Sequence, residues 1–143
     1  MAARFRAAFD GGSRGNPGPA AWGVAVLDED GGCTDGHSGL LGRATNNVAE
    51  YHGLIEALKL AEKHGAEQVE LQADSELIVR QIEGRYRVRH PDLKPLFAEA
   101  MKRIGRFRSF RIRHVRREFN KAADRLVNVA LNRATAAAET PTP

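Results

Sequence analysis

The sequence predicts an α/β fold in which three antiparallel strands come first and helices and strands then alternate. Apolar periodicity switches along the chain between that of strands and that of helices, and Gly- and Pro-rich turns separate the segments. With 143 residues the chain is long enough to bury a core as one domain. We expect this domain to span residues 1–135 and residues 136–143 to form a disordered tail.

Three strands are expected near the N-terminus, at residues 4–10, 20–27 and 32–41. The first ends at Asp10, where the Gly/Pro-rich turn GGSRGNPGP follows, and the turn-rich DEDGG precedes the third. Strands that follow one another over short turns favour an antiparallel meander.

The rest of the chain alternates between helices and strands. Thr45 to Asn47 can cap a helix that ends at Gly65, and Ser75 can cap a second helix at 76–82. The remaining segments follow the same patterns: strands at 68–73 and 107–115, and helices at 91–104 and 120–137.

Charge divides the chain into two unlike halves. Lys and Arg number 22 and Asp and Glu 18, but residues 1–72 carry a net charge of −4 and residues 73–143 carry +8. Between Met101 and Arg117 there are eight basic residues and no acidic one. Such a cluster favours a polyanionic partner such as nucleic acid, although a solvated surface accounts for it equally well.

Several protein classes are excluded by composition. The single cysteine, Cys33, permits neither an internal disulfide nor a cysteine-based zinc site. The N-terminal residues lack the apolar stretch of a signal peptide, and no run approaches the ~20 apolar residues of a membrane span. We expect a cytoplasmic protein without membrane association.

Four acidic residues are placed at the ends of predicted elements. Asp10 and Asp74 end strands, whereas Glu50 and Asp124 lie in the first turns of helices. Taken singly, each acid has a structural explanation as a turn or helix-start residue. Together they lie where open α/β folds assemble their sites, and a cluster of carboxylates needs a cation such as Mg²⁺ to offset its repulsion.

The context of these acids resembles a known family. The segments DGGSRGNPGPAAWG, TNNVAEYHGLIEAL, DSELIVRQIEGRYRV and NKAADRLVNVA resemble, in order, the four signature segments of ribonuclease H type 1. They cover residues 10 to about 130, nearly the whole chain. The resemblance implies a mixed five-stranded sheet flanked by helices.

The resemblance also implies an activity, the endonucleolytic hydrolysis of the RNA strand of RNA/DNA hybrids with 5′-phosphate and 3′-hydroxyl ends. The metal-binding carboxylates would then be Asp10, Glu50, Asp74 and Asp124. They would hold two Mg²⁺ ions about 3.5–4 Å apart, with Asp10 bridging both, and Mn²⁺ is a possible substitute.

Substrate contacts are implied for a second set of residues. The resemblance assigns hybrid contacts to Asn16, Asn46 and Asn47, and a DNA phosphate to Thr45. The basic extension that holds the hybrid in many members is missing here, and Arg85 and Arg87 are candidates to replace it. Duplex RNA is a second candidate substrate, and we expect a monomer.

A further departure concerns the residue that assists catalysis. Many members use a histidine on the loop before the last helix, and His114 lies ten residues before Asp124. Alternation with Ile112 places His114 in the strand instead. The segment VRREFN resembles the short-loop branch of the family, in which an arginine matching Arg117 lies near the site.

Other functions stay open on the sequence alone. The first alternative is a noncatalytic hybrid- or duplex-RNA-binding module of the same fold. The second is a DNA-cleaving nuclease or integrase of the same fold class. A phosphatase lacks support because no nucleophile motif is visible.

Overall fold

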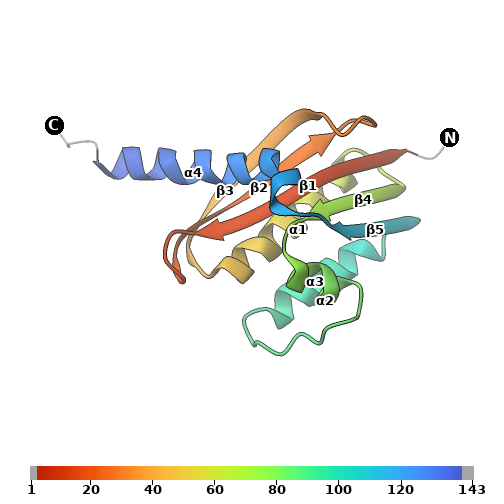
Figure 1. Ribbon diagram of the computed structural model, residues 1–143. Helices are drawn as coiled ribbons and strands as arrows, with labels where there is room; N and C mark the ends of the chain where they lie inside the picture. Colours follow the sequence, from red (N-terminus) through yellow and green to blue (C-terminus); the bar gives the residue numbers. More distant parts are fainter. Residues whose placement is uncertain (1–2, 140–143) are drawn as a thin grey trace.

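The computed structural model describes residues 3–139 and contains one five-stranded mixed sheet (Figure 1). The strand order is β3-β2-β1-β4-β5, in which β1 pairs antiparallel with β2 and parallel with β4. The predicted fold class is therefore confirmed. The strands are β1 (Arg4–Ser13), β2 (Gly18–Leu27), β3 (Cys33–Ala44), β4 (Gln68–Ala73) and β5 (Ser109–His114).

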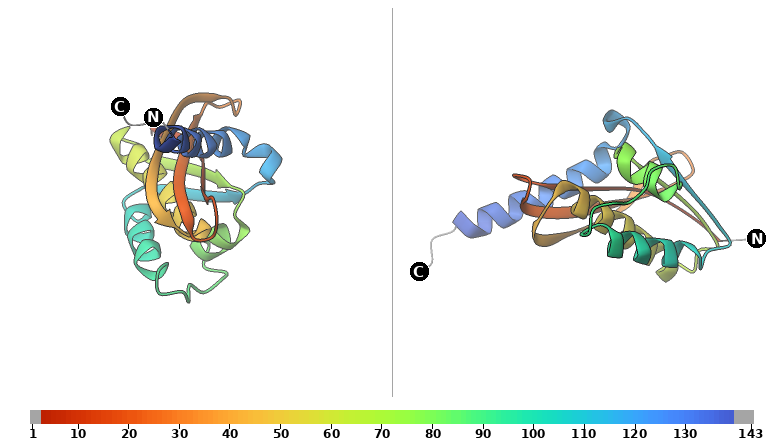
Figure 2. Two further views of the ribbon diagram at one scale, coloured as in Figure 1. Left: turned by 90° about the vertical axis from the view of Figure 1, so that its left-hand side faces the viewer. Right: turned by 90° about the horizontal axis from the view of Figure 1, so that it is seen from below.

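Helices cover the two faces of the sheet unequally (Figures 1 and 2). One face packs against α1 (Asn46–Lys63), α2 (Glu76–Ile82) and α3 (Lys94–Ile104), and the main core, with Phe9, Tyr51 and Leu71, lies between them. The other face carries α4 (Lys121–Glu139), which contacts β1, β2 and β3. The polar side chains of β4 and β5 on the α4 side are therefore left accessible to solvent.

The first two helices begin where the sequence predicts, because their caps are encoded locally. The Thr45 hydroxyl accepts a hydrogen bond from the Val48 backbone N–H at 3.2 Å, and Ser75 does the same for Ile78 at 3.3 Å. Each bond satisfies one of the backbone donors that a helix start leaves free. The predicted start of α1 and the predicted bounds of β4 and α2 are thereby confirmed.

The structure corrects several predicted boundaries. β2 begins at Gly18 rather than at residue 20, β3 spans Cys33–Ala44 rather than residues 32–41, and β5 spans Ser109–His114 rather than residues 107–115.

The ends of three other elements also differ from the prediction. β1 continues past Asp10 to Ser13, because its pairing with β2 goes on through Gly12 opposite Ala21. α3 begins at Lys94 rather than Pro91, and Pro95 occupies its first turn. Proline suits this turn because its N–H groups have no partner within the helix, and proline has no N–H. α4 extends to Glu139, so residues 136–139 are helical rather than part of a disordered tail, in keeping with their run of alanines. Residues 140–143 lie outside the described part.

No helix within residues 3–139 is long and apolar enough to cross a membrane.

Candidate active site

Two neighbouring parallel strands carry two of the carboxylates to one edge of the sheet. The pairing of β1 with β4 ends at Ala8 opposite Gln72. Asp10 and Asp74 each lie two residues further on, so both carboxylates point to the same side of the sheet. The sequence predicts Asp10 at the end of the first strand, but β1 continues to Ser13. Asp10 lies just beyond the part of β1 that pairs with β4.

The third carboxylate is brought in by an unusually close approach of α1 to β1. A Cβ added at Gly11 would lie 2.1 Å from the Ala49 carbonyl oxygen, and one at Gly53 would lie 2.5 Å from the Asp10 carbonyl oxygen. Real side chains do not fit at such distances, so both positions require glycine. This contact places Glu50, in the first turns of α1, beside Asp10.

The three side chains form a tight cluster. One carboxylate oxygen from each of Asp10, Glu50 and Asp74 lies within 4.8 Å of the others. Asp10 and Glu50 are buried, with 6% and 9% of their surface exposed, and Asp74 is partly buried. Glu50 Oε2 is buried without a hydrogen-bond partner.

Burial and mutual repulsion make these groups hard to ionise together. Burial, followed by the charge of Asp74, raises the pKa of Asp10 from 3.8 to about 7. Burial and then the charges of Asp10 and Asp74 raise the pKa of Glu50 well above 4.5. Burial also raises the pKa of Asp74, an effect that Arg117 opposes.

Asp124 lines the same cavity from α4. It lies in the first turn of α4 and lines a cavity of about 440 Å³ together with Asp10, Glu50 and Asp74. It is not part of the 4.8 Å cluster. Its charge nevertheless raises the pKa of both Asp10 and Asp74, so it lies within electrostatic reach of them.

Arg117 lines this cavity from the short 3₁₀ helix η1 (Arg117–Phe119). His114 is the last residue of β5, as the strand alternation predicts. Both side chains lower the pKa of Asp74, against the larger effect of its burial, and Arg117 has the stronger influence of the two. Of this pair, only Arg117 lines the cavity.

Most of the predicted substrate-binding residues line two further cavities. Asn16, Thr45, Asn47 and Arg87 line a cavity of about 340 Å³. Arg85 and Arg87 line a second, more open cavity of about 550 Å³ next to Tyr86, which is 47% exposed.

Asn46 lies between the first of these cavities and the carboxylates. Its backbone N–H donates to Asn16 Oδ1 at 3.1 Å, and its own Oδ1 accepts from the Ser13 N–H at 2.9 Å. Asn46 and Ser13 line the carboxylate cavity, whereas Asn16 lines the neighbouring one. We call this the Asn16–Asn46–Ser13 chain of hydrogen bonds.

A divalent cation fits the carboxylate cluster. The donor atoms are all oxygens, which hard cations such as Mg²⁺ prefer. Glu50 Oε2 is buried and unpartnered, and the pKa values of Asp10 and Glu50 are raised. Arg117 acts on Asp74, but among the described side chains no cation pairs with Asp10 or Glu50, whose negative charge a bound cation would offset.

Sequence reasoning missed Asn120 as a positioning residue. Its side chain is 1% exposed, and its Nδ2 donates to the Phe9 carbonyl at 3.0 Å. Its own carbonyl accepts from the Asp124 N–H at 3.1 Å, so it ties the start of α4 to the strand that carries Asp10. The only sequence signal is an asparagine just before a helix, which does not reveal the contact with β1.

Comparison with known proteins gives a consistent family. Residues 8–130 match the family model described as reverse transcriptase-like. The chain is 44% identical over 129 residues to "Ribonuclease HI" of Halobacterium salinarum, which covers 90% of this chain and 65% of that protein. It is 46% identical over 136 residues to "Bifunctional protein Rv2228c" of Mycobacterium tuberculosis, covering 90% of this chain and 36% of that protein. The chain thus spans about a third to two thirds of these curated relatives.

Solved structures of ribonucleases H are also similar to this chain. The RNase H1 structure from Halobacterium salinarum superimposes with a TM-score of 0.87 at 43% identity, covering 91% of this chain and 98% of that one. The structure of LC11-RNase H1 in complex with an RNA/DNA hybrid gives a TM-score of 0.86 at 42% identity, covering 92% and 99%.

Proposed function

Because the chain belongs to the ribonuclease H type 1 family, we propose that it is an endoribonuclease that hydrolyses the RNA strand of RNA/DNA hybrids. The observation that carries this proposal is the convergence of Asp10, Glu50, Asp74 and Asp124 on one cavity. A noncatalytic binding module would gain nothing from this arrangement, because four carboxylates repel a phosphate backbone.

The carboxylates would hold two divalent cations, with Mg²⁺ as the expected ion and Mn²⁺ as an alternative. Such cations activate a water molecule and stabilise the leaving oxygen in phosphodiester hydrolysis. Asp10, which lies on the central strand β1, would contact both. Glu50 and Asp74 would complete one coordination sphere, and Asp124 the other.

Arg117 is proposed to stabilise charge on the phosphate. It lines the carboxylate cavity from η1, and a guanidinium can donate to two phosphate oxygens at once. Since the attacking group would be a water molecule activated by the cations, hydrolysis requires no nucleophilic side chain. The products would carry 5′-phosphate and 3′-hydroxyl ends.

Recognition of the hybrid is assigned to the neighbouring cavities. Asn16, Asn46 and Asn47 are exposed, and their amides can donate to and accept from 2′-hydroxyl groups in the wide minor groove. We propose that Thr45, Arg85 and Arg87 meet phosphates beside them. Because the arginines are few, we expect weak binding, and each phosphate contact adds to the loss of affinity as salt rises.

A cleavage assay tests the proposal directly. Purified protein is incubated with an end-labelled RNA/DNA hybrid with and without Mg²⁺, and in parallel with duplex RNA and duplex DNA. The proposal requires metal-dependent cuts in the RNA strand of the hybrid, abolished when 2′-deoxynucleotides replace the ribonucleotides at the cut position. Binding without cleavage would identify a noncatalytic module, and cleavage of duplex DNA would indicate a DNA nuclease of the same fold.

A further inference from the structure

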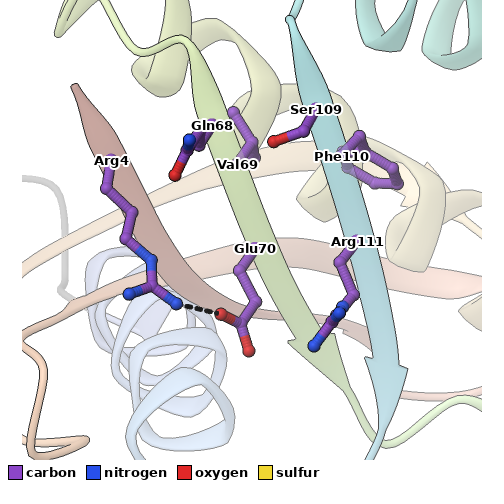
Figure 3. Close-up of a pocket in the computed structure, with 7 residues that line it drawn as sticks. All are labelled: Arg4, Gln68, Val69, Glu70, Ser109, Phe110 and Arg111. Atoms are coloured by element: carbon purple, nitrogen blue, oxygen red, sulfur yellow. Dashed lines mark hydrogen bonds and ion pairs between the residues drawn. The ribbon is translucent and has the colours of Figure 1, made fainter. Parts of the chain in front are cut away.

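The side of β4 and β5 that α4 leaves uncovered carries a set of arginines. Arg4 and Arg6 on β1 and Arg111 and Arg113 on β5 surround Glu70 on β4, and we call these four arginines the arginine face. Figure 3 shows Arg4, Glu70 and Arg111 side by side on the three neighbouring strands, at a cavity of about 300 Å³.

Glu70 forms ion pairs with only two of the four arginines. It forms ion pairs with Arg4 at 3.2 Å and Arg6 at 3.7 Å. Arg113 donates to the neutral Gln72 at 3.3 Å. Within residues 3–139, Arg111 makes no hydrogen bond or ion pair, although it lies opposite Glu70 in the sheet.

This face accounts for part of the basic run at residues 101–117. Arg103 and Arg106, on the helix-covered side, pair with Glu62 at 3.4 and 3.2 Å. Arg111 and Arg113 have no carboxylate of their own and are exposed. Parallel strands are usually covered on both faces, and exposed ion pairs add only about 0–1 kcal/mol, so fold stability does not explain four arginines here.

The arginine face lies on the same side of the sheet as the carboxylate cavity. Side chains alternate along β1 and β4, so Arg6 and Glu70 point to the side from which Asp10 and Asp74 project. At about 3.3 Å per residue, Glu70 at the centre of the face lies about 13 Å along β4 from Asp74. The two sites thus lie on the same side of the sheet, at different points along β4.

The connection from β5 to α4 crosses the sheet between these two sites. Gln72 Nε2 donates to the Phe119 carbonyl of η1 at 3.1 Å, which holds this segment on β4. The Phe119 side chain is 67% exposed. A duplex seated in the cavity is straight on this length scale and cannot bend over the crossing, whereas a single strand can. An exposed aromatic ring is also the usual platform for an unpaired base.

We propose that the arginine face binds the sugar-phosphate backbone of a single-stranded extension that continues from the hybrid past the cleavage cavity. The inference rests on the proposed function, since it assumes a hybrid in that cavity. Arg111 and Arg113 supply the phosphate contacts, and Phe119 stacks on a base where the strand crosses η1.

The test compares a blunt hybrid with the same hybrid carrying a single-stranded DNA extension of about ten nucleotides at either end. Affinity is measured by fluorescence anisotropy in EDTA, so that no cleavage occurs, for the wild type and for Arg111→Gln/Arg113→Gln. The control is Lys63→Gln/Lys102→Gln, which removes two exposed charges from the helix-covered side.

We expect an extension at one end to strengthen wild-type binding at least about fivefold. The arginine variant should lose this gain, with a salt slope shallower by about 0.7 for each lost contact, and should bind the blunt hybrid like the control variant. Cleavage of the blunt hybrid in Mg²⁺, measured separately, tests the proposed function independently of this effect.

Two outcomes would overturn the inference. In one, neither extension strengthens wild-type binding; in the other, the arginine variant keeps the full gain. If neither extension strengthens binding and a poly-glutamate peptide binds the wild type but not the arginine variant, the face is a docking surface for acidic proteins instead.

Discussion

Replacing Asp10 by asparagine should stabilise the metal-free protein while it abolishes cleavage. Burial and the charge of Asp74 raise the pKa of Asp10 from 3.8 to about 7, so the folded protein binds this proton more tightly than the unfolded chain does. Between these two pH values, the free energy of unfolding therefore falls as pH rises, and above pH 7 the loss is complete.

The size of the effect follows from this difference in pKa. About three pKa units at about 1.4 kcal/mol each set an upper limit of about 4 kcal/mol above pH 7. Glu50 and Asp74 still repel each other in the variant, so we expect a gain of about 2 kcal/mol. A carboxamide at this position can also donate to the unpartnered Glu50 Oε2.

Urea unfolding in EDTA at pH 4 and pH 8 measures the gain, with Asp30→Asn as a control at an exposed carboxylate. Asp10→Asn should be the more stable protein at pH 8 and nearly equal to the wild type at pH 4. Saturating Mg²⁺ should reduce the difference, because the ion stabilises the wild-type cluster. The variant should keep or improve hybrid binding without cleaving, since one repulsive charge is gone. A gain that is equal at both pH values, or absent at pH 8, would refute the electrostatic reasoning.

Three further experiments test the site, two of them with a matched control substitution. Arg117→Ala should lower kcat about tenfold or more, whereas His114→Ala should change kcat less than about threefold, both measured by steady-state cleavage. The opposite result would show that His114, and not Arg117, assists catalysis. Gly53→Ala should lower the free energy of unfolding by at least about 1–3 kcal/mol, because the added methyl meets the Asp10 carbonyl, while Gly105→Ala, with its nearest contacts at 3.6 Å, should be nearly neutral in the same urea titration. Asn120→Ala should cost about 1–3 kcal/mol and also lower kcat, because the Phe9 carbonyl loses its donor and α4 its tie to β1; unchanged kcat would show that Asn120 does not position Asp124.

The parts of the fold that depend on local chemistry could be predicted from the sequence. The caps at Thr45 and Ser75 lie within three residues of the amides they bind, so the helix starts follow from the local pattern. Likewise, apolar alternation before Asp74 sufficed to place it at the edge of the sheet. The predicted start of α3 was wrong because Pro91 and Pro95 both suit the first turn of a helix. The local sequence pattern does not show which of the two prolines the helix uses.

The features that depend on distant contacts needed the three-dimensional structure. The proximity of Glu50 to Asp10 follows from the glycine contact between α1 and β1, which joins residues about forty positions apart, and was expected only through the family resemblance. Similarly, nothing in the basic run shows which arginines are exposed on the sheet. That depends on α4 covering β1, β2 and β3 and leaving β5 open.

The Asn16–Asn46–Ser13 chain of hydrogen bonds has a consequence for where the RNA is cut. It fixes the cavity that contains Asn16 relative to the cavity that contains Asp10 through two hydrogen bonds of 3.1 and 2.9 Å, without a long intervening loop. A nucleotide held at the first cavity therefore lies at a constant number of phosphates from the carboxylates. We expect each cut to lie at that fixed distance from the nucleotide bound in the first cavity.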